Sequence, residues 1–487
     1  MQSLLESIKK YAIKQPAKLC VADYNGNKYT YGEYWKLING IADYFKKIGL
    51  KKNDCVIVDT VQSGLFTATA FGIQLAGGIF IPVERNIQRE RLEKIYLETN
   101  AKFIVTVDRN VNNKYCHQLS EIAKHANMII ADLEQFLMPH GDELAEILFT
   151  TGTTGDAKGI MMSFKGNVAI AENISYGVEM KPNNIELIPV PINHSYGLRS
   201  FYASMFNGSS VILLDGFANL GNFFMAIEKY YVTSMALVPA IINMILKISK
   251  GYIKKYSKQL DYIQSGSAAL PEESKKALCK LLPDSKLYNF YGSTESGRCC
   301  ILNYNKEKNK TRCIGKPAYN ASLAIVDDKR HIINSSRDNI GRLACKGKMN
   351  MIGYWNDPAT TKKVLSEEGY ILTSDFCYIE DDYVYYIGRQ DNVINVGGNK
   401  VSPMEIEEVA NGYKSILESI CVPIDDELMG QCTKLFVVMK EKDTFNKIEI
   451  IKYLSKTLEE FKVPKIIEEI SEIPRMYNGK INRKLLK

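Results

Sequence analysis

The sequence contains no CxxC pair, although eleven of its 487 residues are cysteines. The cysteines are scattered and odd in number, which argues against a disulfide framework or a zinc ribbon and for a reducing compartment. Basic residues outnumber acidic ones by only 62 to 55, and we find no basic arm or polybasic block. Nucleic-acid binding is therefore not expected.

A long hydrophobic run is also missing. The most apolar stretch, Thr67 to Val83, contains threonines, Gln74 and three glycines, and it falls short of the roughly 20 apolar residues that a membrane helix needs. The first residues, MQSLLESIKKYAIKQP, predict an amphipathic helix and lack the continuous apolar core and cleavage site of a signal peptide. We expect a cytoplasmic protein without a membrane span.

Short apolar runs alternate with amphipathic helical patterns over most of the chain. The runs CVIVDT (55–60), FIVTV (103–107), MIIAD (128–132) and SVILLD (210–215) predict buried strands. This alternation is typical of an α/β protein with layers of mixed or parallel sheets flanked by helices. From about 320 to 387, ASLAIVDD, GRLACKG and YVYYIG predict a small β-rich subdomain.

A smaller unit follows Gly388. Its predicted helices are EIEEVANGYKSI and IEIIKYLSKTLEEF, and its predicted strands are ICVPI and LFVVMK. The chain is too long for one core, since single domains rarely exceed roughly 250–300 residues. We therefore expect a large N-terminal domain, residues 1–388, and a small α+β C-terminal domain, residues 389–487.

The segment TTGTTGDAKG, residues 150–159, concentrates backbone N–H groups, hydroxyls and one lysine. Glycines let the backbone approach an oxyanion, and Lys158 supplies a positive charge, so the composition indicates a phosphate-binding loop. It is not a Walker A loop, because Ala157 precedes the lysine and Gly159 follows it.

Four further segments complete a set. They are NFYGSTES (289–296), GYILTSDF (369–376), GRQDNVINVGGNKVSPMEIEE (388–408) and NGKINRK (478–484). In this order and at these distances, the five segments resemble the adenylate-forming superfamily of acyl- and aryl-CoA synthetases, nonribosomal peptide synthetase adenylation domains and firefly luciferase. The resemblance covers nearly the whole chain. It implies that a carboxylate attacks the α-phosphate of ATP, and that a thiol then takes the acyl group from AMP.

The resemblance assigns the ATP site position by position. The residues for the β- and γ-phosphates are Thr150, Thr151, Gly152, Thr153, Thr154, Gly155 and Lys158. In NFYGSTE, Tyr291 would stack on adenine, Asn289 would lie near its exocyclic amine, Thr294 would bind the α-phosphate and Glu295 would hold Mg²⁺, with Gly292 and Ser293 between them. Gly266, Ser267 and Ala268 would line both the adenine and the acyl pocket.

The C-terminal segments supply the remaining implied roles. Asp375 and Arg389 would bind the ribose, and Asp391 would be the hinge between the two half-reactions. Lys480 would be the catalytic lysine that bridges the substrate carboxylate and the α-phosphate, although Met476 and Asn478 replace the usual hydroxyl residues of its motif.

The segment PINHSYGLRS (191–200) matches the acid pocket of the family. His194 would gate this pocket, and Ser195 and Tyr196 would shape it. Ser195 replaces the aspartate that pairs with the ammonium of an α-amino acid, so an acyl or aryl acid is expected. Arg199 could meet a second polar group of the substrate or form a surface salt bridge.

The thiol acceptor stays open at this point. Gly397 and Gly398 resemble the loop beside the pantetheine tunnel of CoA ligases. We find no carrier domain after the lysine motif, so the acceptor would be CoA or the phosphopantetheine of a separate acyl or peptidyl carrier protein. The sequence opposes two other classes. The retained Lys158, Glu295, Asp375 and Lys480 argue against a binding protein that has lost the chemistry, and the failed Walker pattern argues against an unrelated nucleotide hydrolase.

Overall fold

The computed structural model describes residues 1–107, 115–128, 136–150, 158–217, 219–390, 393–397, 399–441, 443–475 and 483–486. The chain divides into two compact units. The first unit comprises residues 1–323 and 344–372, and the second comprises residues 324–343 and 373–487. These units are defined by compactness, whereas the predicted boundary at residue 388 separates two domains that would rotate relative to each other during the reaction. That boundary stays a prediction.

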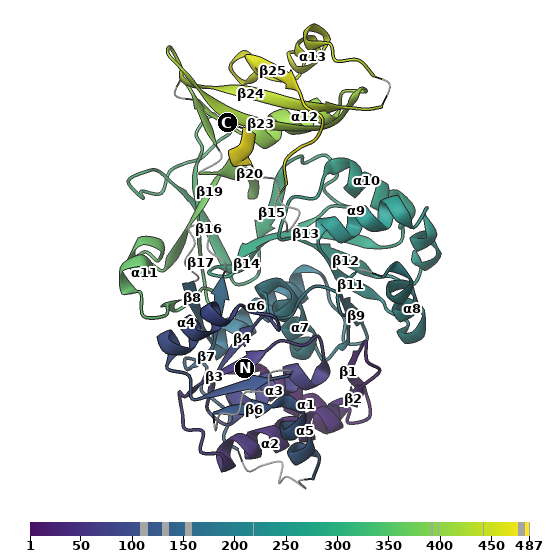
Figure 1. The fold of residues 1–487 in the computed structure, drawn as a ribbon, viewed down its shortest axis with the longest axis vertical. Coiled ribbons are helices and arrows are strands. Elements are labelled where there is room, and N and C mark those ends of the chain that lie inside the picture. The colour runs from purple at the N-terminus through teal and green to yellow at the C-terminus, as the bar shows by residue number, and fades with distance from the viewer. Residues whose placement is uncertain are drawn as a thin grey trace. The chain divides into compact units, whose positions relative to one another are not determined.

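Most of the described helices follow amphipathic segments of the sequence, whereas α3 is buried at almost every position (Figure 1). In chain order they are α1 (Leu4–Lys14), α2 (Tyr31–Lys47), α3 (Gly64–Leu75), α4 (Arg89–Thr99), α5 (Leu119–Met128), α6 (Phe164–Gly177), α7 (Ser195–Asn207), α8 (Leu220–Tyr230), α9 (Pro239–Ile248), α10 (Glu272–Leu281), α11 (Pro358–Val364), α12 (Pro403–Asn411) and α13 (Lys447–Leu454), with short 3₁₀ turns η1 (Tyr252–Tyr256), η2 (Glu460–Lys462) and η3 (Arg483–Leu486).

The strands alternate with these helices in the first half of the chain and dominate the second half. In chain order they are β1 (Leu19–Asp23), β2 (Lys28–Thr30), β3 (Cys55–Asp59), β4 (Ile79–Val83), β5 (Phe103–Thr106), β6 (Cys116–Gln118), β7 (Leu144–Thr150), β8 (Lys158–Ser163), β9 (Ile185–Ile188), β10 (Ser210–Leu213), β11 (Ser234–Leu237), β12 (Tyr262–Ser265), β13 (Lys286–Ser293), β14 (Gly297–Asn303), β15 (Cys313–Pro317), β16 (Ala321–Val326), β17 (Gly341–Gly347), β18 (Gly353–Tyr354), β19 (Tyr370–Glu380), β20 (Tyr383–Arg389), β21 (Ile394–Val396), β22 (Asn399–Val401), β23 (Ile416–Asp426), β24 (Gly430–Met439) and β25 (Ile466–Glu469).

One sheet of the first unit has the strand order β18-β8-β7-β4-β3-β5-β6. Its central strands β3, β4 and β5 are parallel, and every residue of β3 and β4 is buried. Continuous apolar runs such as CVIVD and IFIPV form such strands because both faces of the sheet are covered. At one edge, β8 returns antiparallel to β7 and pairs with β18.

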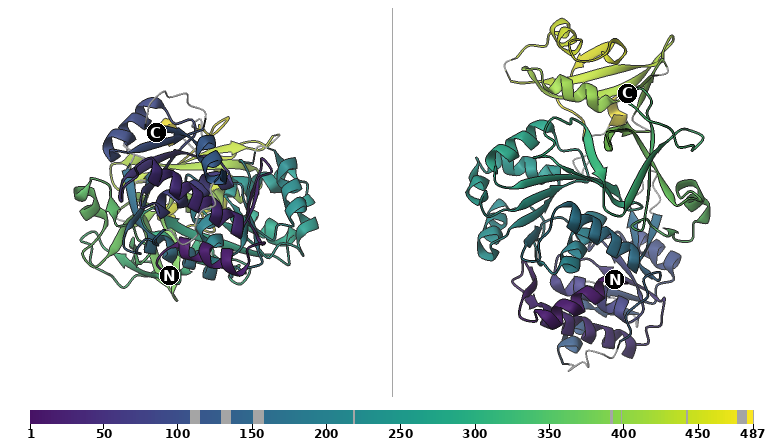
Figure 2. Two further views of the ribbon diagram at one scale, coloured as in Figure 1. Left: turned by 90° about the horizontal axis from the view of Figure 1, so that it is seen from below. Right: turned by 180° about the vertical axis from the view of Figure 1, so that it is seen from behind.

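The second sheet of the first unit runs β15-β14-β13-β12-β11-β9-β10-β1-β2. It is parallel from β13 to β1, whereas β14 and β15 continue as antiparallel strands. Helices α8, α9 and α10 lie along this sheet in Figure 1, with α8 against β9 and α10 against both α9 and β13. The N-terminal helices form their own layer, in which α2 packs on α1, α3 and α5 (Figure 2).

The second unit contains a sheet of order β22-β21-β24-β23, and β25 pairs in parallel with β24. Helix α12 packs on β23 and also contacts α13. The core of this unit includes Ile394, Val401, Ile406, Leu435 and Ile450, all fully buried. Strands β16, β17, β19 and β20 follow one another in a sheet, as expected for the β-rich subdomain. The chain passes between the two units within β16, β17 and β19.

These elements confirm the predicted fold class, an α/β protein with a large N-terminal part, a β-rich subdomain and a small α+β part. The predicted strands at 55–60, 103–107 and 210–215 become β3, β5 and β10. The predicted strand at 128–132 begins at the last residue of α5 and otherwise lies outside the described residues. None of the described helices combines the length and the hydrophobicity required to cross a lipid bilayer.

Candidate functional site

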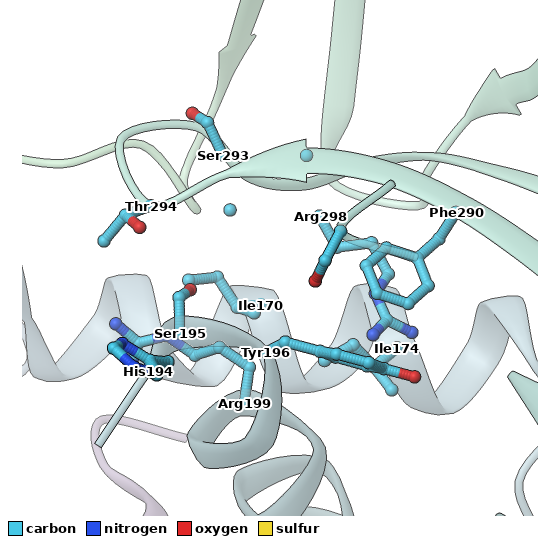
Figure 3. Close-up of a pocket in the computed structure, with 13 residues that line it drawn as sticks. Ile170, Ile174, His194, Ser195, Tyr196, Arg199, Phe290, Ser293, Thr294 and Arg298 are labelled. Atoms are coloured by element: carbon cyan, nitrogen blue, oxygen red, sulfur yellow. The ribbon is translucent and has the colours of Figure 1, made fainter. Parts of the chain in front are cut away.

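A cavity of about 230 Å³ lies in the first unit between helices α6 and α7 and strands β13 and β14 (Figure 3). It brings together residues predicted from three separate segments of the sequence. The predicted residues in its wall are His194, Ser195, Tyr196, Ser267, Gly292, Ser293 and Thr294. Ile170, Ile174 and Phe290 add apolar surface, and Arg199 and Arg298 add two buried cations.

The hairpin of β13 and β14 positions Thr294. Its register shifts between Tyr291 and Gly292, which marks a bulge where the strand bends. A Cβ on Gly292 would lie 2.0 Å from the carbonyl oxygen of Gly297, so the two strands can approach only because position 292 is glycine. The turn is closed by the Ser296 backbone N–H, which donates to Ser293 Oγ at 3.1 Å.

Two aromatic rings cover the far side of the cavity. The rings of Tyr196 and Phe290 lie with their centroids 4.8 Å apart, and the Tyr196 hydroxyl donates to the backbone oxygen of Gln264 at 2.9 Å. Burial raises the pKa of Tyr196, which keeps this hydroxyl a neutral donor. A Cβ on Gly266 would lie 2.3 Å from the Phe290 ring, so glycine is required for the ring to sit there. The small-residue segment therefore shapes the pocket, with Ser267 at φ 70° and Ala268 exposed beside it.

Asn289 offers an unused acceptor for a ligand. It lies on β13 and is only 8% exposed, and its side-chain oxygen accepts no hydrogen bond from any described residue. Asn289 and Tyr291 are two positions apart on the strand, so their side chains point to the same face. An amide oxygen of this kind fits the exocyclic amine of adenine, and an aromatic ring on the same face fits stacking against a base.

A second cluster in the first unit joins the phosphate loop to Glu295. Thr150 and Lys158 are register partners, at the end of β7 and the start of β8. Lys158 Nζ lies 5.3 Å from the centroid of the Tyr354 ring, and the Tyr354 hydroxyl donates to Glu295 Oε1 at 2.9 Å. Thr151, Gly152, Thr153, Thr154 and Gly155 lie outside the described residues.

Tyr354 is a member of this cluster that our sequence analysis missed. It lies on β18, and its register partner is Ile160 on β8, so sheet pairing alone brings it beside Lys158. Burial and the charge of Glu295 both raise the pKa of Tyr354, so the hydroxyl stays protonated as a donor. The only signal in the sequence is the aromatic pair in MIGYW, which is equally typical of a core segment.

The second unit holds the predicted ribose residues next to each other. Asp375 and Arg389 are cross-strand partners on β19 and β20, with Arg389 Nε 3.7 Å from Asp375 Oδ1. Gly397 has φ 57°, and a Cβ there would lie 2.4 Å from the methyl group of Met429. Asp391, Gly398 and Lys480 lie outside the described residues, so their predicted roles stay predictions.

Arg483, three residues after Lys480, is anchored within the second unit. Its guanidinium donates to Glu407 Oε1 at 2.7 Å and to the backbone oxygen of Cys421 at 2.6 Å. The arginine of the predicted lysine motif therefore holds the end of the chain to α12 and β23, which is a positioning role.

The cavity contains two buried arginines, Arg199 and Arg298, and the sequence left the role of Arg199 open between a substrate contact and a surface salt bridge. Arg199 is 3% exposed and pairs with Glu146, so it is not a surface salt-bridge partner. Arg298 is 4% exposed, lines the same cavity and was not predicted. A signal for it exists in GRCCIL, where one charged residue interrupts an otherwise apolar strand.

Comparison with known proteins identifies the family of this chain. The model of the family described as AMP-binding enzyme matches residues 8–355, and that of the AMP-binding enzyme C-terminal domain matches residues 405–480. The curated relatives include 4-coumarate--CoA ligase 3 of Arabidopsis thaliana, which is 26% identical, with 95% of this chain and 86% of that protein covered. They also include peroxisomal OPC-8:0-CoA ligase 1 of Arabidopsis thaliana, 26% identical, with 94% of this chain and 88% of that protein covered.

The fold has solved counterparts as well. ATP-bound MatB from Rhodopseudomonas palustris aligns with a TM-score of 0.86 and 22% identity, covering 100% of this chain and 98% of that one. The resemblance to adenylate-forming enzymes is thus confirmed over both parts of the chain. The chain belongs to the AMP-binding enzyme family.

Proposed function

We propose that this protein is an AMP-forming acid–CoA ligase. In the first half-reaction a substrate carboxylate oxygen attacks the α-phosphorus of ATP, the bond to the β-phosphate breaks, and pyrophosphate leaves. In the second half-reaction the thiolate of CoA attacks the acyl carbon, the bond to AMP breaks, and a thioester forms. The family match and the CoA ligase names of the relatives support this chemistry.

The single observation that carries the proposal is the cavity itself. Thr294, the residue predicted to meet the α-phosphate, lies in the same wall as His194 and Ser195, the residues predicted to meet the acid. A reacting carboxylate and the phosphate it attacks must be held in near-attack geometry, because positioning supplies much of the rate of such a reaction. One small cavity lined by both residue sets meets that requirement.

The residues outside this cavity, on β13 and in the second cluster, have distinct tasks in the proposal. Asn289 and Tyr291 hold the adenine, and Lys158 neutralises the phosphates that leave. Bound to Glu295, Mg²⁺ would offset the negative charge of the phosphate oxygens, and a single carboxylate is an ordinary protein contribution to such a site. The Tyr354 hydroxyl keeps the Glu295 carboxylate oriented through its hydrogen bond.

Acid-dependent exchange of labelled pyrophosphate into ATP tests the first half-reaction. A panel of acyl, aryl and amino acids with Mg²⁺ should give exchange with an acyl or aryl acid and none with α-amino acids. If folded protein catalyses exchange with none of these acids, the proposal that it is an enzyme is refuted. Adding CoA should then yield AMP and an acyl-CoA, whereas acylation of a carrier protein but not of CoA would replace the proposed acceptor.

Replacement of the proposed catalytic lysine gives the sharpest loss. Lys480→Ala should lower the rate of pyrophosphate exchange by about 100- to 1,000-fold, the usual cost of removing one donor that stabilises charge in a transition state. ATP binding, measured by calorimetry, should stay within a few-fold of wild type. Lys452→Ala, at an exposed position on α13, is the matched control and should exchange normally. Equal rates for both variants would show that Lys480 is not the catalytic lysine.

A further inference from the structure

Arg298 is a buried cation that the proposed reaction does not use. It lies on β14 and is 4% exposed, and its side chain lines the cavity (Figure 3). The guanidinium carbon lies 3.5 Å from the centroid of the Phe290 ring and 5.9 Å from that of Tyr196. The group is therefore held against aromatic faces, the arrangement that arginine favours when it is removed from water.

A chain of hydrogen bonds fixes the orientation of this guanidinium. One of its nitrogens donates to Gln264 Oε1, and Gln264 Nε2 donates in turn to Glu186 Oε1 at 2.6 Å. Glu186 is fully buried and also accepts from Ser234 Oγ at 3.2 Å and from the Tyr262 hydroxyl. Glu186 thus fixes the orientation of the Gln264 amide, and Gln264 fixes the orientation of the Arg298 guanidinium. The cation is therefore preorganised before any ligand binds.

The charge of Arg298 is not balanced by direct contact with an anion. Within the described part of the chain it makes one side-chain hydrogen bond, to a neutral amide, and no ion pair. Burial lowers the pKa of Arg298 to about 10, so the group is still a cation at neutral pH. Glu186 attracts it through the intervening Gln264, but burial raises the pKa of that carboxyl and weakens the compensation. A buried cation in this state is costly unless an anion enters the cavity.

The position of Arg298 in the cavity indicates that this anion is a group at the far end of the substrate acid. Thr294 and His194 lie on one side of the view in Figure 3, and Arg298 and Phe290 lie on the other. An acid whose reacting carboxylate lies beside His194, next to the phosphate held at Thr294, therefore extends its other end toward Arg298. The walls between the two ends are Ile170, Ile174 and Tyr196, which suit a short apolar spacer.

We propose that Arg298 is a specificity-determining residue that binds a second carboxylate, so that the preferred substrate is a short dicarboxylic acid. The proposal rests on the proposed function and names the substrate class of the same site. A planar guanidinium presents paired N–H donors that match the two oxygens of a carboxylate. A cavity of about 230 Å³ is below the roughly 300–1,000 Å³ of pockets for drug-sized ligands, which favours a short spacer.

The test compares acids that differ only at the far end. Pyrophosphate exchange is measured with succinate against butyrate, glutarate against pentanoate, and isophthalate against 3-methylbenzoate. In wild type, kcat/KM for the dicarboxylate of the best pair should exceed that of its partner at least about 30-fold, the value that corresponds to about 2 kcal/mol for a buried charge pair that loses one partner. The difference should appear mainly in KM, because the distal group does not change during the reaction.

The variants separate recognition from structure. Arg298→Met should remove the advantage of the dicarboxylate while the rate with the monocarboxylate is kept or increased, and Arg298→Lys should retain part of the advantage. Circular dichroism checks that each variant is folded. Lys286→Met is the control and should leave the selectivity unchanged. Lys286 lies on β13, the neighbour of β14, and the variant breaks only an exposed ion pair with Glu179.

Three results would overturn the proposal. These are a preference of the wild type for the monocarboxylates, an equal loss with both members of a pair in Arg298→Met, and an unchanged preference in that variant. If wild type exchanges with no acid at all, the proposed function fails instead. Calorimetry with the dicarboxylates then decides the role of Arg298 by itself, because tighter binding to wild type than to Arg298→Met would support it and equal binding would reject it.

Discussion

Two arginines line one cavity and are almost equally buried, yet their surroundings differ. Arg199, on α7, is ion-paired with Glu146 and donates to Asn167 Oδ1 at 2.8 Å. The Tyr202 hydroxyl adds a hydrogen bond to Glu146 Oε2 at 2.7 Å. Arg298, on β14, reaches only the neutral amide of Gln264 and the face of Phe290.

The difference distinguishes a structural cation, Arg199, from a cation that we propose binds a ligand, Arg298. The charge of Arg199 is neutralised inside the protein, so its removal would leave Glu146 buried and unpaired. The charge of Arg298 has no anion in direct contact, so its removal would leave no charged group without a directly bonded partner, only the neutral amide of Gln264 without its donor. The two arginines should therefore fail in opposite ways, one in stability and the other in recognition.

The largest effect on stability should come from Arg199→Met. Removing one partner of a buried ion pair usually costs about 3–5 kcal/mol, because the remaining charge is left without compensation. Urea unfolding should show this loss in the free energy of unfolding. The double variant Arg199→Met, Glu146→Gln should recover much of it, since no charge stays buried. A loss below about 1 kcal/mol in the single variant would mean that Arg199 is not a structural cation.

A smaller loss of stability is expected for Arg298→Met. The variant leaves the Gln264 side-chain oxygen without its donor, and a buried acceptor in this state costs about 1–3 kcal/mol. The same urea experiment measures it, and the value should be below that of Arg199→Met. A larger loss than that of Arg199→Met would reverse the comparison, because Arg298 would then be the structural cation of the pair.

The smallest effect should be a pH dependence of the free energy of unfolding that is caused by Glu186. Burial raises the pKa of Glu186 more than its hydrogen bonds from Tyr262 and Gln264 lower it. A carboxyl with a raised pKa stabilises the fold at low pH, and this stabilisation is lost as the pH rises through the raised value. The stability of Glu186→Gln relative to wild type should therefore increase as the pH rises above the ordinary glutamate pKa of about 4.3.

The link to Arg298 sharpens this last experiment. Without the attraction of the arginine, ionised Glu186 should be less favourable still, so the pH dependence should be steeper in an Arg298→Met background. A difference between Glu186→Gln and wild type that does not vary with pH would show that Glu186 titrates alike in the folded and unfolded chain.

The sequence was sufficient for the architecture, because its apolar runs and motifs are local. The runs that became β3, β5, β10 and β20 could be recognised from their apolar residues, and the five motifs singled out Thr294, Asn289 and Asp375 as candidates without any structure. Each of these runs and motifs consists of a few consecutive residues. They need no knowledge of what packs against them.

The remaining parts of the site depend on pairing between distant segments. Tyr354 meets Glu295 because β18 pairs with β8, and Gln264 meets Arg298 because β12, β13 and β14 are adjacent in the sheet. For Arg199, the two alternatives drawn from the sequence both omitted its true partner, Glu146, which lies 53 positions earlier on β7. Only the fold decides which charges are neutralised.

The most direct test of the account is the binding of two non-reactive acyl-adenylate analogues. Both carry a sulfamoyl link in place of the phosphate, and they differ only in a terminal carboxylate or methyl group at the end of a short acyl chain. The account predicts that wild type binds the carboxylate form at least about 30-fold more tightly, and that Arg298→Met binds both forms alike. Equal binding of the two forms by wild type would contradict it.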